Sequence, residues 1–298
     1  MFRIGKRIFL FFAINILILV TLSFTLNILG IGGYFSARGI DYNNLMAFCL
    51  VWGMGGAFIS LALSRVMAKW MMGVVVIDPE TREPQLAALV RTVHKLASAA
   101  GLPAMPEVGY YPSPEINAFA TGPTKSRALV AVSAGLLKRM DQVQLEGVLG
   151  HEISHIANGD MVTMTLIQGI INAFVMFLAR VIAFFIANRG DSSERSSAPS
   201  YLIIFVLEIA LSALGMIAVS AFSRRREFRA DAGGAQLAGR TSMIKALEAL
   251  QSTAAYADLT NKSSMATLKI AGKPKRLSSL FATHPPLEER IERLKALV

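Results

Sequence analysis

The chain has 298 residues, of which 53% are hydrophobic and only 17% are charged. This composition is too apolar for an ordinary soluble domain and indicates a membrane protein. The formal net charge of +10 is compatible with nucleic-acid binding, but basic flanks of membrane spans explain most of it, so nucleic acid is not expected as a partner. The single cysteine, Cys49, excludes an intrachain disulfide framework.

Four apolar runs are each near or above the roughly 20 residues that span a hydrocarbon core. They cover residues 8–29, 45–63, 162–187 and 201–222. The first follows basic residues, lacks a small-residue cleavage site and is long for a signal peptide, so we interpret it as a retained anchor. Basic residues also follow the second and fourth runs, which places these flanks and both termini in the cytoplasm. The lipid bilayer is therefore an expected partner.

The apolar runs interrupt the polar part of the chain. We expect a membrane hairpin in residues 1–65, the first half of a cytoplasmic domain in 66–160, a second hairpin in 161–222 and the second half in 223–298. The two polar halves must pack together to bury a core. The predicted fold class is a mainly α integral membrane protein with four hydrophobic helices and a cytoplasmic α+β domain.

In the first polar half, apolar spacing predicts a helix over residues 85–99. His94 on this helix has no partner one turn away, so we interpret it as structural. Three β-prone stretches follow, separated by turn residues. They cover residues 107–111, 117–121 and 128–132 and predict a short antiparallel sheet.

A second helix is bounded by clear end signals. Asp141 followed by Gln144 resembles a capping box that opens it, and Asn158-Gly159 closes it. Asp160, directly afterwards, is interpreted as a turn residue before the third apolar run rather than as a metal ligand.

This helix carries the sequence His151-Glu152-Ile153-Ser154-His155. The two histidines are one turn apart, so both rings can reach one ion, while Glu152 projects toward a water at an open coordination position. The pattern favours a catalytic zinc ion, one per chain. A structural zinc site is the alternative, although such sites more commonly have four ligands rich in cysteine.

A catalytic zinc ion usually takes three protein ligands. The three-histidine pattern H-E-x-x-H-x-x-G-x-x-H is excluded because residues 158 and 161 are Asn and Met. The best remaining candidate is Glu227, which lies one helical turn from Asp231 at the cytoplasmic end of the fourth run. Glu227 can bind the metal while Asp231 accepts a hydrogen bond from a ligating histidine. Alternatively, both acids only balance the neighbouring arginines.

Two charged residues lie inside the second predicted hairpin. Arg180 and Glu208 are each seven positions from the expected outer end of their run, so an antiparallel hairpin brings them to a similar depth. We predict that they form an ion pair, in preference to lining a substrate or ion pathway.

Four motifs together resemble those of the HtpX-type membrane metalloproteases, which are distantly related to the CAAX prenyl endopeptidases. They are His151-Glu152-x-x-His155, Glu227-x-x-x-Asp231, Asn117-Ala118-Phe119-Ala120-Thr121-Gly122 and Thr283-His284-Pro285-Pro286. The resemblance covers essentially the whole chain. It implies a zincin-like cytoplasmic domain in which zinc is held by His151, His155 and Glu227, with Glu152 as the base and Asp231 beside a ligand.

The resemblance also assigns two further regions. It implies that Asn117, Ala118, Phe119 and Ala120 form an edge strand beside the cleft, where an extended peptide adds by main-chain hydrogen bonds; ordinary sheet is the alternative. It gives His284 a role in stabilising an oxyanion, with Pro285 restricting the backbone to extended conformations. The alternative is a structural loop residue before a C-terminal helix.

The function implied is that of a multi-pass zinc endopeptidase of a bacterial-type inner membrane. Its expected substrates are misfolded or damaged membrane proteins, cleaved in their cytoplasmic loops, and unfolded polypeptides, within protein quality control and the stress response. Two alternatives remain open: a peptidase for a narrow set of membrane-bound or prenylated substrates, and a zinc-dependent membrane chaperone or scaffold without turnover.

Overall fold

The structure is a computed structural model that describes residues 42–187, 197–261 and 280–296. The first predicted span, residues 8–29, lies outside the described residues. The chain divides into two compact units. One comprises Met1–Leu61 and Thr163–Val219, and the other comprises Ala62–Val162 and Ser220–Val298.

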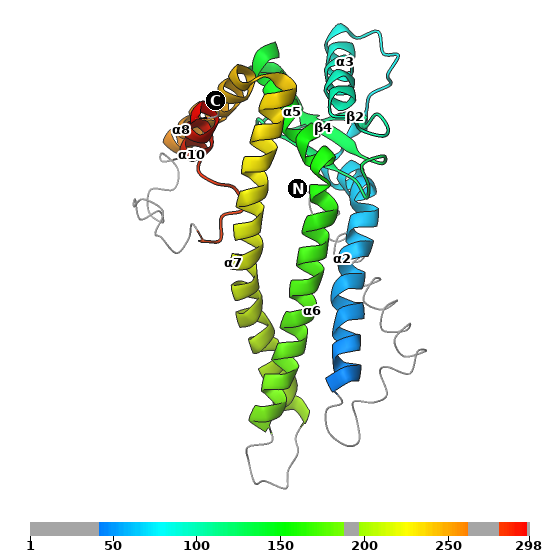
Figure 1. Cartoon of the computed structure of the whole chain (residues 1–298), viewed down its shortest axis with the longest axis vertical. Coiled ribbons are helices and arrows are strands. Elements are labelled where there is room, and N and C mark those ends of the chain that lie inside the picture. Colours follow the sequence, from blue (N-terminus) through cyan, green and yellow to red (C-terminus); the bar gives the residue numbers. More distant parts are fainter. Residues whose placement is uncertain (1–41, 188–196, 262–279, 297–298) are drawn as a thin grey trace. The chain divides into compact units, whose positions relative to one another are not determined.

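The first unit is built from parts of three long helices (Figure 1). They are α2 (Tyr42–Met72), α6 (Asp160–Ala187) and α7 (Ser197–Ala238). Among the described residues, these 3 helices are long and apolar enough to cross a membrane. They correspond to the second, third and fourth predicted spans. Each helix is longer than the apolar run that predicted it, because helical residues continue into the polar flanks.

Small residues and one ion pair connect the helices of the first unit. A Cβ atom added at Gly53 of α2 would lie 2.5 Å from the backbone nitrogen of Ala173 on α6, so the glycine permits close helix packing. Arg180 of α6 donates to Glu208 of α7 at 2.7 Å, which confirms the predicted pair. Burying two opposite charges together avoids the high cost of leaving either one alone in an apolar environment.

The second unit contains a four-stranded sheet in the order β1-β2-β4-β3. Its strands are β1 (Val75–Val76), β2 (Glu107–Tyr111), β3 (Ala118–Thr121) and β4 (Leu129–Ser133). The three stretches predicted in the sequence are β2, β3 and β4. The prediction of an antiparallel sheet is wrong at its centre, because β2 and β4 pair in parallel while the two outer pairs are antiparallel.

The mixed pairing follows from where the chain goes after β2. The segment 112–117 carries it past the position of β4 to the far edge, where β3 forms, and a hairpin then returns β4 between β3 and β2. All five residues of β4 are buried, as expected for an inner strand of a sheet covered on both faces. Two strands that follow each other in a hairpin can be predicted to pair from the sequence. The pairing of β2 with β4 depends instead on how the chain packs between them.

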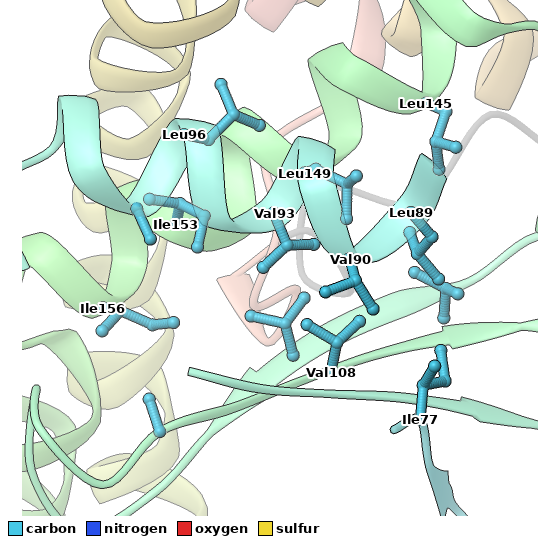
Figure 2. Close-up of a cluster of buried hydrophobic side chains, with 14 of the residues drawn as sticks. Ile77, Leu89, Val90, Val93, Leu96, Val108, Leu145, Leu149, Ile153 and Ile156 are labelled. Carbon is cyan, nitrogen blue, oxygen red and sulfur yellow. The ribbon is translucent and has the colours of Figure 1, made fainter. Parts of the chain in front are cut away.

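Helices complete the second unit. They are α3 (Pro84–Ala99), α4 (Ala134–Arg139), α5 (Gln142–Asn158), α8 (Arg240–Asn261) and α10 (Leu287–Ala296), with the C-terminal part of α7. Figure 2 shows the main core, in which Val90 and Val93 of α3 meet Leu149 and Ile153 of α5 above Val108 of the sheet. Full burial of each such side chain contributes about 1.5–3 kcal/mol. This packing fixes α5 firmly against the sheet.

Candidate metal centre

Helix α5 carries the histidine pair, and its ends are fixed by local interactions. The Asp141 carboxylate accepts from the Gln144 backbone N–H at 2.8 Å, and the Gln144 side chain accepts from the Asp141 N–H at 3.1 Å. Gly159 ends the helix in the left-handed region, with φ of 69°. The predicted capping box and glycine stop are therefore confirmed, and His151 and His155 occupy one face of a well-defined helix.

Three side chains converge at the centre of the site. The Nε2 atoms of His151 and His155 are 3.1 Å apart, and the Glu227 carboxylate lies 3.4 Å from the first and 3.3 Å from the second. One ligand atom from each residue falls within 4.8 Å of the others. Glu227 is fully buried. Two imidazole nitrogens and one carboxylate suit a transition-metal ion, so the geometry fits a metal site with an open coordination position.

Close contact between α5 and α7 brings Glu227 to the histidines. A Cβ atom at Gly234 of α7 would lie 3.0 Å from the backbone nitrogen of His151, and one at Gly150 of α5 would lie 3.2 Å from the carbonyl oxygen of Gly234. A Cβ atom at Gly233 would lie 2.1 Å from Ser154 Oγ. The helices can approach this closely only because these positions lack side chains. We did not predict this contact from the sequence, although the pair Gly233-Gly234 inside a helix was an available signal.

The outer nitrogen of His151 is held by a buried carboxylate. Its Nδ1 lies 2.9 Å from Asp231 Oδ1, the arrangement expected from the one-turn spacing of Glu227 and Asp231. Arg290 of α10 donates two hydrogen bonds to Asp231, at 2.8 and 2.7 Å. Arg290 is 6% exposed. Sequence reasoning missed it, although an arginine on the apolar face of the helix 287–294 was a visible anomaly.

The outer nitrogen of His155 is held in the same way by Asp160. Its Nδ1 lies 2.6 Å from Asp160 Oδ2, and Arg229 of α7 donates to the other carboxylate oxygen at 2.6 Å. Interpreting Asp160 as a turn residue was wrong: it is the first residue of α6 and is 1% exposed. Its contact with His155 depends on how the chain turns at Gly159, and the hydrophobic periodicity of the sequence does not predict the geometry of that turn.

His284 reaches the site from the loop before α10. Its Nδ1 lies 2.8 Å from Glu227 Oε2, although its side chain is 62% exposed. Two hydrogen bonds connect this loop to α7. Ser220 donates to the Phe281 carbonyl at 3.1 Å, and Arg224 donates to the Ala282 carbonyl at 2.8 Å. The structure thus places this histidine beside Glu227, one of the three residues that could hold a metal ion.

Two further predicted parts of the site are Glu152 and the segment 117–120. Glu152 follows His151 on α5 and is half-buried. Strand β3 is an edge strand that pairs with β4 on one side and contacts α5. Among the described residues, no strand pairs with its other side.

The carboxylates set the electrostatics of the site. Burial alone would lower the pKa of His151, but hydrogen bonds to Asp231 and Glu227 outweigh it and raise this pKa to about 9. The pKa of His155 is raised against burial by Asp160 and Glu227. Burial would raise the pKa of Glu227, but the three histidines around it hold that pKa well below its usual range. The carboxylates therefore favour the charged forms of His151 and His155, and the histidines favour the charged form of Glu227.

Comparison with known proteins finds a matching family and similar proteins over most of the chain. Residues 83–298 match the profile of Peptidase family M48. The chain is 51% identical over 299 residues to a protease HtpX homolog of Bacillus subtilis (strain 168), covering 98% of this chain and 99% of the relative. It is 50% identical over 294 residues to a protease HtpX homolog of Thiobacillus denitrificans, with the same shares covered.

A solved structure has a similar fold. The crystal structure of S. mikatae Ste24p superposes with a TM-score of 0.63 at 20% sequence identity. The alignment covers 96% of this chain, which spans 63% of the length of that chain. At this identity the likeness concerns the fold alone.

Proposed function

The chain belongs to Peptidase family M48 and is a metallopeptidase, and from that premise we propose that it is a membrane-anchored zinc endopeptidase acting on misfolded or damaged membrane proteins. The observation that carries the proposal is the convergence of His151, His155 and Glu227 within 4.8 Å, with Glu152 directly after His151 on α5. Two imidazoles, one carboxylate and an open position form the ligand set of catalytic rather than structural zinc.

In the proposed mechanism, His151, His155 and Glu227 would hold a zinc ion, which when bound would activate a water molecule and polarise the scissile carbonyl. Glu152 takes a proton from that water and delivers it to the leaving amine. Asp231 keeps the Nε2 lone pair of His151 directed inward by accepting from its Nδ1–H. His284, beside Glu227 and accessible to solvent, donates to the oxyanion that develops on the substrate.

Two substitutions separate catalysis from metal binding. We expect Glu152→Ala to retain zinc and to lose peptidase turnover by a factor of about 10²–10⁴, because it removes the proton carrier and no ligand. Glu227→Ala should lose zinc itself. Purified protein in detergent is assayed for metal content and for cleavage of casein and of a membrane-protein substrate, with a chelator control. Undiminished turnover by Glu152→Ala would exclude this mechanism.

The same assay distinguishes the other functions. Cleavage confined to a prenylated or otherwise defined substrate would support a narrow peptidase. Protection of unfolded protein from aggregation without cleavage, equal in wild type and Glu152→Ala, would support a chaperone or scaffold. The proposed role in quality control requires cleavage of unfolded chains of unrelated sequence.

Strand β3 supports a specific mode of substrate binding. Asn117 exchanges hydrogen bonds with Ser133, donating to its hydroxyl at 3.1 Å and accepting from its backbone N–H at 2.9 Å. Because backbone groups alternate between the two sides of an antiparallel strand, the N–H and C=O of Ala118 and Ala120 point away from β4. A peptide can add to this edge through those two residues, while Phe119 bonds with β4.

We expect Ala118→Pro to raise KM for a peptide substrate with a smaller effect on kcat, because it removes one outward N–H without removing a bond to β4. Ala118→Ser, which retains the N–H, is the matched control. Steady-state kinetics with a fluorogenic peptide measures both constants. Equal KM values for the two variants would rule out pairing at this position.

A further inference from the structure

The buried Asp160 and the half-exposed Arg229 connect His155, a candidate metal ligand, to α7. Both oxygens of the Asp160 carboxylate are engaged, one with His155 Nδ1 and the other with Arg229 Nη2, each at 2.6 Å. Asp160 is on α6, the helix after the one that carries His155, and Arg229 is two residues beyond Glu227. The contacts therefore join α5 and α7, the two helices that supply all three candidate metal-binding residues.

From this arrangement we propose that Asp160 and Arg229 are positioning residues that fix the ring orientation and tautomer of His155 for metal binding. The inference rests on the proposed function only in taking the three converging residues as metal ligands. A carboxylate can only accept, so His155 donates from Nδ1. Its Nε2 lone pair is then directed at His151 and Glu227, where a metal ion would bind.

Arg229 stabilises the buried, charged carboxylate of Asp160. Asp160 is almost fully buried, and a buried carboxylate needs a charged partner as well as a hydrogen bond. Arg229 provides both at the second oxygen, so the carboxylate cannot rotate without losing one of its two bonds. The Arg229 side chain is 54% exposed, so solvent screens its charge, and its effect should be smaller than that of Asp160.

The site thus contains two parallel connections. On one side Arg290 holds Asp231, which holds His151. On the other side Arg229 holds Asp160, which holds His155. The one-turn spacing of Glu227 and Asp231 suggested the first carboxylate, whereas the second becomes apparent only when α5, α6 and α7 are seen together.

The experiment measures metal binding as well as activity, because an ion pair that only stabilises the fold would not change the metal's surroundings. Wild type, Asp160→Ala, Arg229→Ala and Asp141→Ala are purified, and the zinc dissociation constant is measured by competition with a chelator. Absorption spectra of the cobalt-substituted proteins report ligand geometry. Asp141→Ala is the matched control, since it removes an aspartate that caps α5 but does not contact either histidine.

We expect Asp160→Ala to weaken zinc binding about 10–100-fold and to alter the cobalt spectrum. Arg229→Ala should weaken zinc binding several-fold, on the order of a tenth of that effect. Asp141→Ala should change neither the zinc affinity nor the cobalt spectrum. If Asp160→Ala does not fold, Arg229→Ala provides the answer, because that side chain is half exposed. Wild-type affinity and an unchanged spectrum in the folded variants would overturn the inference. By contrast, a wild-type protein that binds zinc but never cleaves peptides would overturn the proposed function alone.

Discussion

At the scale of single residues, the site depends on charges that are buried in pairs. Burial would raise the pKa of Asp231 and lower that of Arg290, but their mutual hydrogen bonds shift both pKa values the opposite way, toward the charged forms. Glu227 is likewise surrounded by cationic or hydrogen-bonding groups. Removing one member of such a pair leaves the other charge buried without a partner, which is more costly than losing a surface ion pair.

Arg290→Ala should therefore lower the free energy of unfolding by about 3–5 kcal/mol, because Asp231 stays buried without its arginine. Arg82→Ala, at an exposed position, should change it by no more than about 0.5 kcal/mol. Denaturant unfolding in detergent measures both variants. Equal midpoints for the two would show that the Arg290 pair contributes no net stability.

At the scale of elements, helix spacing determines whether the ligands meet. The cap signals of α5 could be read from the sequence because Asp141, Gln144 and Gly159 act locally. The approach of α7 to α5 could not, because it depends on the glycines at the helix contact and on the core that fixes α5 against the sheet. The parallel pairing of β2 and β4 was unpredicted for a similar reason, since a crossover is a long-range choice.

We expect Gly234→Ala to destabilise the protein by about 1–3 kcal/mol and to weaken metal binding, because its Cβ would lie 3.0 Å from the His151 nitrogen and push α7 away. Gly56→Ala is the control, since a Cβ there meets no atom within 4 Å. Thermal unfolding and chelator competition measure the two effects. If both variants bind metal as wild type does, close packing at Gly234 does not position the ligands.

At the scale of the whole molecule, the basic flanks of the apolar helices predict on which side of the membrane the candidate metal centre lies. The described residues contain 3 helices long and apolar enough to span a bilayer. Positive residues at Arg65, Lys69 and Arg224–Arg226 are the basis for expecting the second unit in the cytoplasm. A cytoplasmic site would meet membrane proteins at their cytoplasmic loops.

A cysteine introduced by Glu80→Cys, at an exposed position of the second unit, should react with an impermeant maleimide only after the cells are permeabilised. Ser193→Cys, between the third and fourth apolar runs, should react without permeabilisation. The native Cys49 is buried and should add little background. The reverse labelling pattern would contradict a cytoplasmic site.

The sequence by itself determined the local features: the apolar helices, the capped helix with His151 and His155, the spacing of Glu227 and Asp231, and the pairing of Arg180 with Glu208. The first three depend on periodicity or on neighbours within a few turns, and the ion pair follows from the equal depth of its two residues in an antiparallel hairpin. Only the tertiary structure decided how the sheet is ordered and how Arg290, Arg229 and Asp160 reach the histidines. Apart from His155 and Asp160, which lie on successive helices, those contacts join residues far apart in the chain, and their geometry is set by how closely the helices pack.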